Sequence, residues 1–283
     1  MSDSEKPKKP KKPAEEIVKE ASDWWSTSII DIHPGEIDIR GYPIQDLIGN
    51  ISFPQMIYLM LKGDLPNEVQ GRLLEAALVS SVDHGPHAPS IAISRMAISC
   101  GVGLNGAMAS AVNVLDDVHG GAGEQCMELH QLIMSKDNKG NLSTAVDEAL
   151  EEWIAENGKV IPGYGHRWHP VDPRSGRLLG MVDEAAKTGV VSGKYVKIGW
   201  EIEAGIKRRT GKDIPMNVDG ATAVIFSELG FAPPLGRGIF ILSRSVGILA
   251  HAWEQKQENR RIKGPLPKSI PFTYTGPARR RLD

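Results

Sequence analysis

Two histidines and one aspartate stand in sequence settings that suit catalysis. His119 lies between an apolar segment and a glycine-rich turn, and His166 lies in a loop that contains Gly163 and Gly165. Glycine neighbours let the backbone and a ligand approach an imidazole closely. Asp219 begins a run of small and apolar residues. Each has a structural alternative, because histidines are common in turns and aspartate is among the best helix N-caps.

Two arginines are candidates for binding an anionic substrate. Arg174 follows Asp172 and Pro173, so a plain ion pair with a nearby carboxylate would also explain it. Arg244 interrupts the apolar segment 239–250. A buried guanidinium needs an anionic partner, and a substrate carboxylate is one such partner. His33 and His130 lie in polar surroundings and receive no role.

Several other kinds of site find no support in the sequence. There is no HExxH motif and no local ligand spacing among the histidines, which argues against a metal site. There is no P-loop, and the glycine pattern at 101–106 lies in a helical stretch rather than after a strand. Cys100 and Cys126 form no CxxC pair, and both are expected to be buried and inert.

The composition is that of a soluble globular protein. The chain has 283 residues, of which 41% are hydrophobic and 24% charged, with a formal net charge of −2. This balance gives no overall attraction to nucleic acid or to an anionic membrane. No apolar h-region opens the chain, and no apolar run approaches the roughly 18 residues of a membrane span. We therefore expect a cytoplasmic protein with no nucleic-acid or membrane partner.

Periodicity predicts a mainly α fold with a short N-terminal β element. A basic, proline-interrupted tail over residues 1–13 is expected to be disordered. Alternation around Pro34 and Gly35 predicts a small hairpin or an extended arm over Ile29–Ile39. Apolar spacing of three and four residues predicts helices over 44–61, Val69–Ser80, Ser90–Leu115, Thr144–Asn157, Lys194–Thr210, Ala221–Leu229 and Gly238–Gln255.

Taken together and in order, the motifs resemble those of the citrate synthase family. His119, His166, Asp219 and Arg244 are separated by 47, 53 and 25 residues, close to the family pattern. The resemblance spans about residues 29–263. It rests on Arg40–Leu47, Tyr58–Pro66, Val82–Gly85, His119–Ala122 (HGGA), Gly163–His166 with Asp172–Arg174, Asn217–Asp219 and Ser243–His251.

The resemblance implies enolate chemistry between an acyl-CoA and a 2-oxoacid such as oxaloacetate. Asp219 would remove the α-proton of the acyl-CoA, and His119 would donate a hydrogen bond to the thioester oxygen. His166 would polarise or protonate the carbonyl oxygen of the oxoacid, and in the reverse direction it would take the hydroxyl proton. CoA enters as a co-substrate, and neither a tightly bound cofactor nor a metal is implied.

The same resemblance implies a set of carboxylate-binding residues. His84, Arg174 and Arg244 would hold the oxoacid, since an arginine fork pairs bidentately with a carboxylate. Citrate synthases also lend one arginine across a dimer, and Lys263 aligns best with it, with Arg260 or Arg261 as alternatives. If Lys263 is that residue, one bidentate contact is lost and the acceptor would differ from oxaloacetate.

The implied architecture is a two-domain helical fold assembled as a homodimer or a higher homo-oligomer. The large domain would comprise 14–119 and 235–283, and a small domain over 120–234 would close over the ligands. The short chain and the Asn217–Gly220 motif also resemble citryl-CoA lyases. An inactive CoA- or carboxylate-binding regulatory homologue is the alternative, which the presence of His119, His166 and Asp219 disfavours.

Overall fold

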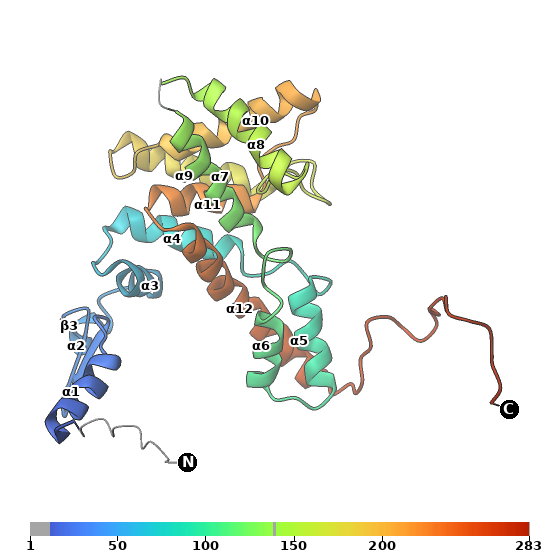
Figure 1. Cartoon of the computed structure of the whole chain (residues 1–283), viewed down its shortest axis with the longest axis horizontal. Coiled ribbons are helices and arrows are strands. Elements are labelled where there is room, and N and C mark those ends of the chain that lie inside the picture. The colour runs from blue at the N-terminus through green and yellow to red at the C-terminus, as the bar shows by residue number, and fades with distance from the viewer. Residues whose placement is uncertain (1–11, 138–139, 283) are drawn as a thin grey trace, which may run out of the picture. The chain divides into compact units, whose positions relative to one another are not determined.

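The computed structural model describes residues 12–137 and 140–282 (Figure 1). The chain divides into two compact units, Met1–Asn67 and Glu68–Asp283, called here the N-terminal unit and the helical unit. Up to residue 11, the predicted basic tail lies outside the described residues. The domain boundaries predicted after residues 119 and 234 both fall inside the helical unit, and they remain predictions.

The N-terminal unit confirms the predicted hairpin and adds a third strand. Strands β1 (Ile30–His33) and β2 (Glu36–Ile39) pair antiparallel, and β3 (Tyr42–Pro43) pairs with β2. His33 faces Glu36 across a two-residue turn of Pro34 and Gly35, and Gly35 has a φ of 87°. A turn with proline followed by a residue of positive φ favours glycine at the second place.

The described part of the N-terminal unit, residues 12–67, also contains three helices. They are α1 (Ala14–Trp24), α2 (Ile44–Leu47) and α3 (Phe53–Lys62). A reciprocal capping box between Ser52 and Gln55 begins α3, and Gly63, with a φ of 94°, ends it. Both signals satisfy backbone groups that a helix leaves unpaired at its termini.

One long helix organises the helical unit. This helix, α12 (Pro233–Glu258), packs against α4 (Glu68–Ser80), α5 (Pro89–Ser99), α6 (Leu104–Val112) and α7 (Ala122–Lys136) (Figure 1). At 26 residues it is about 39 Å long at 1.5 Å per residue. Because of this length, one helix can contact the α5–α6 pair as well as α4 and α7.

The remaining helices pack against one another and against α7 and α4. They are α8 (Leu142–Asn157), α9 (Pro173–Lys187), α10 (Lys194–Thr210) and α11 (Val218–Glu228). The central member is α11, which contacts α4, α7, α9, α10 and α12. Every residue from Gly220 to Phe226 is buried, so this short apolar helix has protein on all sides.

Most predicted helices are confirmed, and two of the predicted helices are divided. The helical stretch predicted over 44–61 forms α2 and α3, because residues 48–52 are not helical. Ser90–Leu115 forms two helices instead of one, because Gly101 takes a φ of 91° and ends α5, and Gly103 begins α6. Three helices, α1, α7 and α9, were not predicted. The prediction that both cysteines are buried holds for Cys126 but fails for Cys100, which is exposed at the end of α5.

Two findings concern the described residues as a whole. None of the helices described in 12–137 and 140–282 is both long and apolar enough to cross a membrane. Within the same residues, no group of three or more His, Cys, Asp or Glu side chains is arranged to hold a metal ion.

Replacing Gly247 by alanine should destabilise the fold, because α12 touches the backbone of another segment there. A Cβ at Gly247 would stand 2.2 Å from the carbonyl oxygen of Val82. Overpacking of this kind costs about 1–3 kcal/mol. Gly180→Ala on α9 is the matched control, since a Cβ there meets nothing within 4 Å. The control should gain about 0.5–1 kcal/mol. Urea unfolding measures the free energy of unfolding of both variants. A change of the same sign in the two variants would contradict the close contact at Gly247.

Candidate active site

Asn217, not Asp219, caps the N-terminus of α11. The Asn217 Oδ1 atom accepts hydrogen bonds from the backbone N–H groups of Asp219 and Gly220, at 2.9 Å and 3.3 Å. The capping alternative for Asp219 is therefore wrong. In the described part of the chain, no hydrogen bond occupies the Asp219 carboxylate, which leaves it available for chemistry.

The loop that carries His166 is joined to the start of α11 by backbone contacts. Asn217 N–H donates to the Gly163 carbonyl at 2.9 Å, and Gly165 N–H donates to the Pro215 carbonyl at 2.9 Å. A Cβ at Gly163 would stand 2.7 Å from the Cα of Gly220, so only glycine fits this crossing. The geometry explains why a glycine turn precedes His166: it lets two backbones touch.

Asp219 sits in an environment that makes a carboxylate more basic. Its side chain is half-buried, and burial raises the pKa of Asp219 above its ordinary value. The positive charges of Arg174 and Arg244 oppose the rise, whereas the negative charge of Asp172 adds to it. A base held between these opposing fields is a typical feature of catalytic sites.

The tautomer of His166 is fixed by its own loop. The Nδ1 atom accepts hydrogen bonds from the backbone N–H groups of Trp168 and His169, at 3.0 Å and 3.1 Å. A neutral imidazole with Nδ1 as acceptor carries its proton on Nε2. Burial is the largest of the causes that lower the pKa of His166, so the neutral form is favoured. His166 therefore presents an Nε2–H donor.

His119 is fixed in the opposite tautomer by the first turn of α5. The backbone N–H of Ser90 donates to His119 Nε2 at 3.2 Å, and the Ser90 hydroxyl lies 3.0 Å from the same atom. The proton of the neutral ring is then on Nδ1. Burial, followed by the charge of Arg244, lowers the pKa of His119. A helix N-terminus disfavours the imidazolium form for the same reason.

Arg174 is both an ion-pair partner and a possible ligand. It forms a bidentate pair with Asp172 through Nε and Nη2, at 2.9 Å and 2.8 Å, and Nη1 donates to the Ser80 carbonyl at 3.2 Å. These bonds use three of the five N–H donors of a guanidinium. The plain ion-pair explanation is thus correct, and two donors remain for a substrate carboxylate.

Arg244 is a buried cation without a carboxylate partner. Only 6% of its surface is exposed, Nε donates to the Ser81 carbonyl at 3.1 Å, and the guanidinium lies 4.9 Å from the centre of the Phe240 ring. The described residues form no ion pair with it, and burial lowers the pKa of Arg244. Arg95, also buried, pairs with Glu254 and Glu258. The contrast supports a ligand anion beside Arg244.

The turn that bears His84 is held by α12. His251 Nε2 lies 3.3 Å from Asp83 Oδ2, and the Ser243 hydroxyl donates to the Leu78 carbonyl at the end of α4. The His84 ring then lies edge-on to the His166 ring, with centroids 5.3 Å apart. His84, which the motif predicts to bind the oxoacid, therefore lies beside His166.

Six of the seven predicted site residues are brought together, and Lys263 is not. The backbone N–H of Lys263 donates to the Ser99 hydroxyl at the far end of α5. Ser99 lies nine residues, or about 13 Å of helix, from Ser90, which contacts His119. Lys263 is therefore remote from this chain's own cluster, and its role across a dimer stays a prediction.

The sequence interpretation missed three residues that organise the site. Asp172 caps α9 and binds Arg174, Asn217 caps α11, and Ser90 orients His119. The Asp172–Pro173 pair, with proline at the first helical position, is an N-terminal signal that indicates a cap. No local pattern links Ser90 to His119, because they are 29 residues apart.

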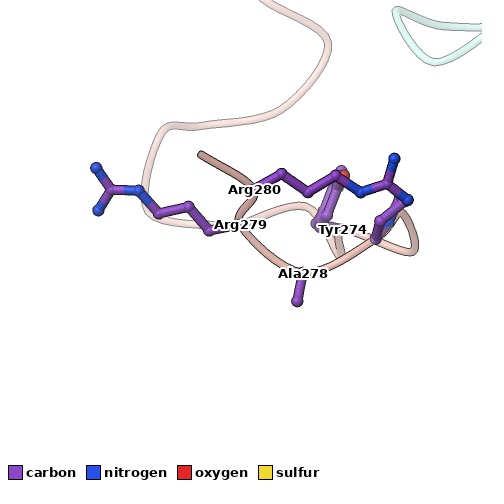
Figure 2. Close-up of a pocket in the computed structure, with 5 residues that line it drawn as sticks. Tyr274, Ala278, Arg279 and Arg280 are labelled. Carbon is purple, nitrogen blue, oxygen red and sulfur yellow. The ribbon is translucent and has the colours of Figure 1, made fainter. Parts of the chain in front are cut away.

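An open hollow elsewhere on the surface contains none of these residues. It is formed by the exposed C-terminal segment and is lined by Tyr274, Pro277, Ala278, Arg279 and Arg280 (Figure 2). The segment folds around itself there. We therefore place the candidate active site at the His119, His166 and Asp219 cluster.

Comparison with known proteins now identifies the family. The model of the citrate synthase C-terminal domain matches residues 19–72 and 66–265, which is most of the chain. This chain belongs to the citrate synthase family. It is 32% identical to the citrate synthase of Haloferax volcanii over 72% of this chain, and 34% identical to that of Deinococcus radiodurans over 72%. In both cases it covers 52% of the relative, so it spans about half the length of these curated relatives.

Solved structures also match this chain, and the share of the matched protein that the chain covers differs between them. A citryl-CoA lyase from Hydrogenobacter thermophilus matches with a TM-score of 0.80 and 39% identity, over 92% of this chain and 97% of the lyase. A citrate synthase from Thermotoga maritima matches with a TM-score of 0.63 and 25% identity, over 82% of this chain and 60% of the synthase. The citrate synthase-like fold predicted from the motifs is confirmed.

A buried histidine outside the predicted set should make the protein acid-sensitive. His130, expected in polar surroundings, is fully buried against Cys126 and Ser227, and burial lowers its pKa to about 4 from 6.5. The unfolded chain therefore binds the proton more tightly, and stability falls as the pH drops from 6.5 towards 4. The full loss is about 3 kcal/mol.

Chemical unfolding across this pH range measures the effect. In His130→Gln the free energy of unfolding should fall less steeply between pH 6.5 and 4 than in the parent, whatever its absolute value. His33→Gln, at an exposed strand residue, is the control and should leave the slope unchanged. If the free energy of unfolding of His130→Gln falls with pH as steeply as that of the parent, groups other than His130 cause the acid sensitivity.

Proposed function

We propose that this chain catalyses the making and breaking of a carbon–carbon bond between an acyl-CoA enolate and a 2-oxoacid. One observation carries the proposal. An unoccupied carboxylate, Asp219, is grouped with two neutral histidines whose acceptor nitrogens are already occupied by backbone N–H groups. A base together with two preorganised hydrogen-bond donors is what enolate formation beside a carbonyl requires.

The chemistry assigns a separate role to each group. In condensation, Asp219 removes the α-proton of the thioester, and the Nδ1–H of His119 stabilises the enolate oxygen. The Nε2–H of His166 polarises the carbonyl of the oxoacid, and His84, Arg174 and Arg244 hold its carboxylates. In cleavage, the hydroxyl proton of the substrate passes to solvent and the carbon–carbon bond breaks to give the oxoacid carbonyl and the enolate. Asp219, which starts this direction protonated, then gives its proton to the enolate carbon. The Nε2-protonated tautomer of His166 supports polarisation more than acceptance of the hydroxyl proton, because Nε2 has no free lone pair.

We further propose that the cleavage of citryl-CoA, or of a closely related 3-hydroxyacyl-CoA, is the main direction. The chain is 39% identical to the Hydrogenobacter thermophilus citryl-CoA lyase, with a TM-score of 0.80, against 25% and 0.63 for the Thermotoga maritima citrate synthase. CoA then leaves as part of the acetyl-CoA product. Closure of a small domain (120–234) over a large one (14–119 and 235–283) would shield the enolate from water.

A homodimer is proposed as the assembled form. Leu242, Val246, Leu249 and Trp253 recur on one face of α12, and between 42% and 59% of each side chain is exposed. A contiguous apolar stripe of this kind marks an interaction surface. Lys263 would then serve the partner's site. Light scattering of the purified chain measures the assembly, and a monomer at micromolar concentration would contradict the proposal.

The direct test compares both directions of the reaction. Citryl-CoA cleavage should be measured as oxaloacetate release, and condensation as thiol release from acetyl-CoA or propionyl-CoA with a panel of 2-oxoacids. Asp219→Asn should lower kcat at least about 1,000-fold while CoA binding is retained, since it removes the base and keeps the shape. Binding of CoA and citrate without turnover in the parent would instead indicate the inactive regulatory homologue.

Replacing Arg244 separates ligand binding from stability. In Arg244→Met the affinity for the oxoacid should fall at least about 100-fold, because a buried carboxylate loses its charged partner. The melting temperature should stay level or rise, since the folded state no longer buries an unpaired guanidinium.

Arg95→Met is the matched control for this experiment. Arg95 is buried to a similar extent but pairs with Glu254 and Glu258, so its loss leaves two carboxylates unpaired. The control should lower the melting temperature and leave the affinity for the oxoacid nearly unchanged. A large loss of stability in Arg244→Met with normal oxoacid affinity would refute the assignment.

A further inference from the structure

The Asp172 side chain is fully buried at the junction of two elements of the site. It is the N-cap of α9, and its carboxylate receives four hydrogen bonds. Oδ1 accepts from Arg174 N at 3.0 Å and from Arg174 Nε at 2.9 Å, and Oδ2 accepts from Arg174 Nη2 at 2.8 Å and from Val218 N at 3.0 Å. These donors fill the roughly four lone-pair sites of a carboxylate.

One of the four donors belongs to the helix of the base. Val218 is the first residue of α11, and Asp219 follows it directly. The other three donors belong to Arg174. A single rigid carboxylate therefore fixes the plane of a guanidinium and the first turn of the helix that presents the base.

We propose that Asp172 is a positioning residue that couples the oxoacid-binding arginine to the base. It holds the guanidinium of Arg174 so that the two remaining N–H donors meet a substrate carboxylate, and it fixes Asp219 relative to that carboxylate through Val218. The inference rests on the proposed function. It assigns to Asp172 a part in both oxoacid affinity and proton abstraction.

Charge supports the same assignment. The negative charge of Asp172 helps to raise the pKa of Asp219 and offsets part of the opposing effect of Arg174. Without it the base would be weaker at neutral pH. The charged and titratable groups that face Asp219 from the surrounding elements are Asp172 and Arg174 of α9, Arg244 of α12, His166 of the preceding loop and Cys126 of α7.

A purely structural cap would behave differently, and the chain offers one for comparison. Glu228 accepts hydrogen bonds from the backbone N–H groups of Ser192, Gly193 and Tyr195, at 2.9 Å, 3.1 Å and 2.7 Å, and so caps α10. Glu228 touches none of the predicted site residues through these bonds. Glu228 is the last residue of α11, at the end opposite Asp219. Loss of its charge tests what a carboxylate cap contributes without a contact to an arginine or to the first turn that carries the base.

The experiment compares Asp172→Asn with Glu228→Gln in the full chain. In Asp172→Asn the KM for the oxoacid, or for citryl-CoA, should rise at least about 10-fold, and kcat should fall about 10- to 100-fold because the base is displaced. In the condensation direction, where Asp219 acts as the base, the acidic limb of the kcat–pH profile should move to lower pH, because the pKa of Asp219 falls. Glu228→Gln should lower the melting temperature and leave KM, kcat and the pH limb unchanged.

Asp172→Glu tests the position of the carboxylate without removing its charge. It replaces Asp172→Asn in the comparison if that variant does not fold. It keeps the charge but is one carbon longer, so KM should rise while the acidic limb stays in place. An unchanged KM and pH limb in either variant, relative to Glu228→Gln, overturns the proposal.

Hydrogen exchange keeps this test separate from that of the proposed function. If the parent turns over no acyl-CoA, the proposed function fails, and Asp172 is judged by the amide of Val218. That amide should exchange at least about 10-fold faster in Asp172→Asn and normally in Glu228→Gln, because opening of the α11 start exposes it. Unchanged exchange at Val218 overturns the positioning role whatever the activity.

Discussion

The contact between the Gly163–Gly165 turn and the start of α11 is the constraint on which the site depends. Two backbones meet there closely enough that a Cβ at Gly163 would overlap Gly220, and Asn217 bonds to both sides of the contact. This crossing brings a histidine loop to the helix of the carboxylate. If Gly163 or Gly220 were replaced by a larger residue, the two backbones would have to separate. His166 and Asp219 would then no longer lie in one site.

The other elements around that contact orient the polar side chains of the site. The first turn of α5 sets the His119 tautomer, the loop after His166 sets the opposite tautomer, and α12 carries Arg244 into the interior. Backbone N–H groups do most of this orienting, and they cost little reorganisation during a reaction. Both histidines present an N–H donor in their neutral forms. In the proposed cleavage reaction, His166 would therefore polarise an oxygen and would not readily accept a proton at Nε2.

Stability and function make opposite demands at two places in the helical unit. Arg244 is buried without a carboxylate partner in the described residues, which weakens the fold, and the proposed substrate carboxylate would supply that partner. Asp172 is the reverse case, since its four hydrogen bonds stabilise the fold and orient Arg174 at once. The exposed apolar side chains of α12 are a further cost to the isolated chain, because water solvates them poorly. The proposed dimer would cover them.

The sequence by itself determined the fold class, the family and the identity of six clustered residues, because periodicity and ordered motifs are local signals. It gave α10 its bounds, Lys194–Thr210, through the glycines on either side. It could not decide whether Asp219 or Asn217 caps α11, whether Arg174 pairs with Asp172 or a ligand, or that His130 is buried. Those outcomes depend on which distant backbone N–H groups and apolar surfaces meet a side chain. Only the tertiary structure decides that, because packing joins residues such as Ser90 and His119 that no spacing rule connects.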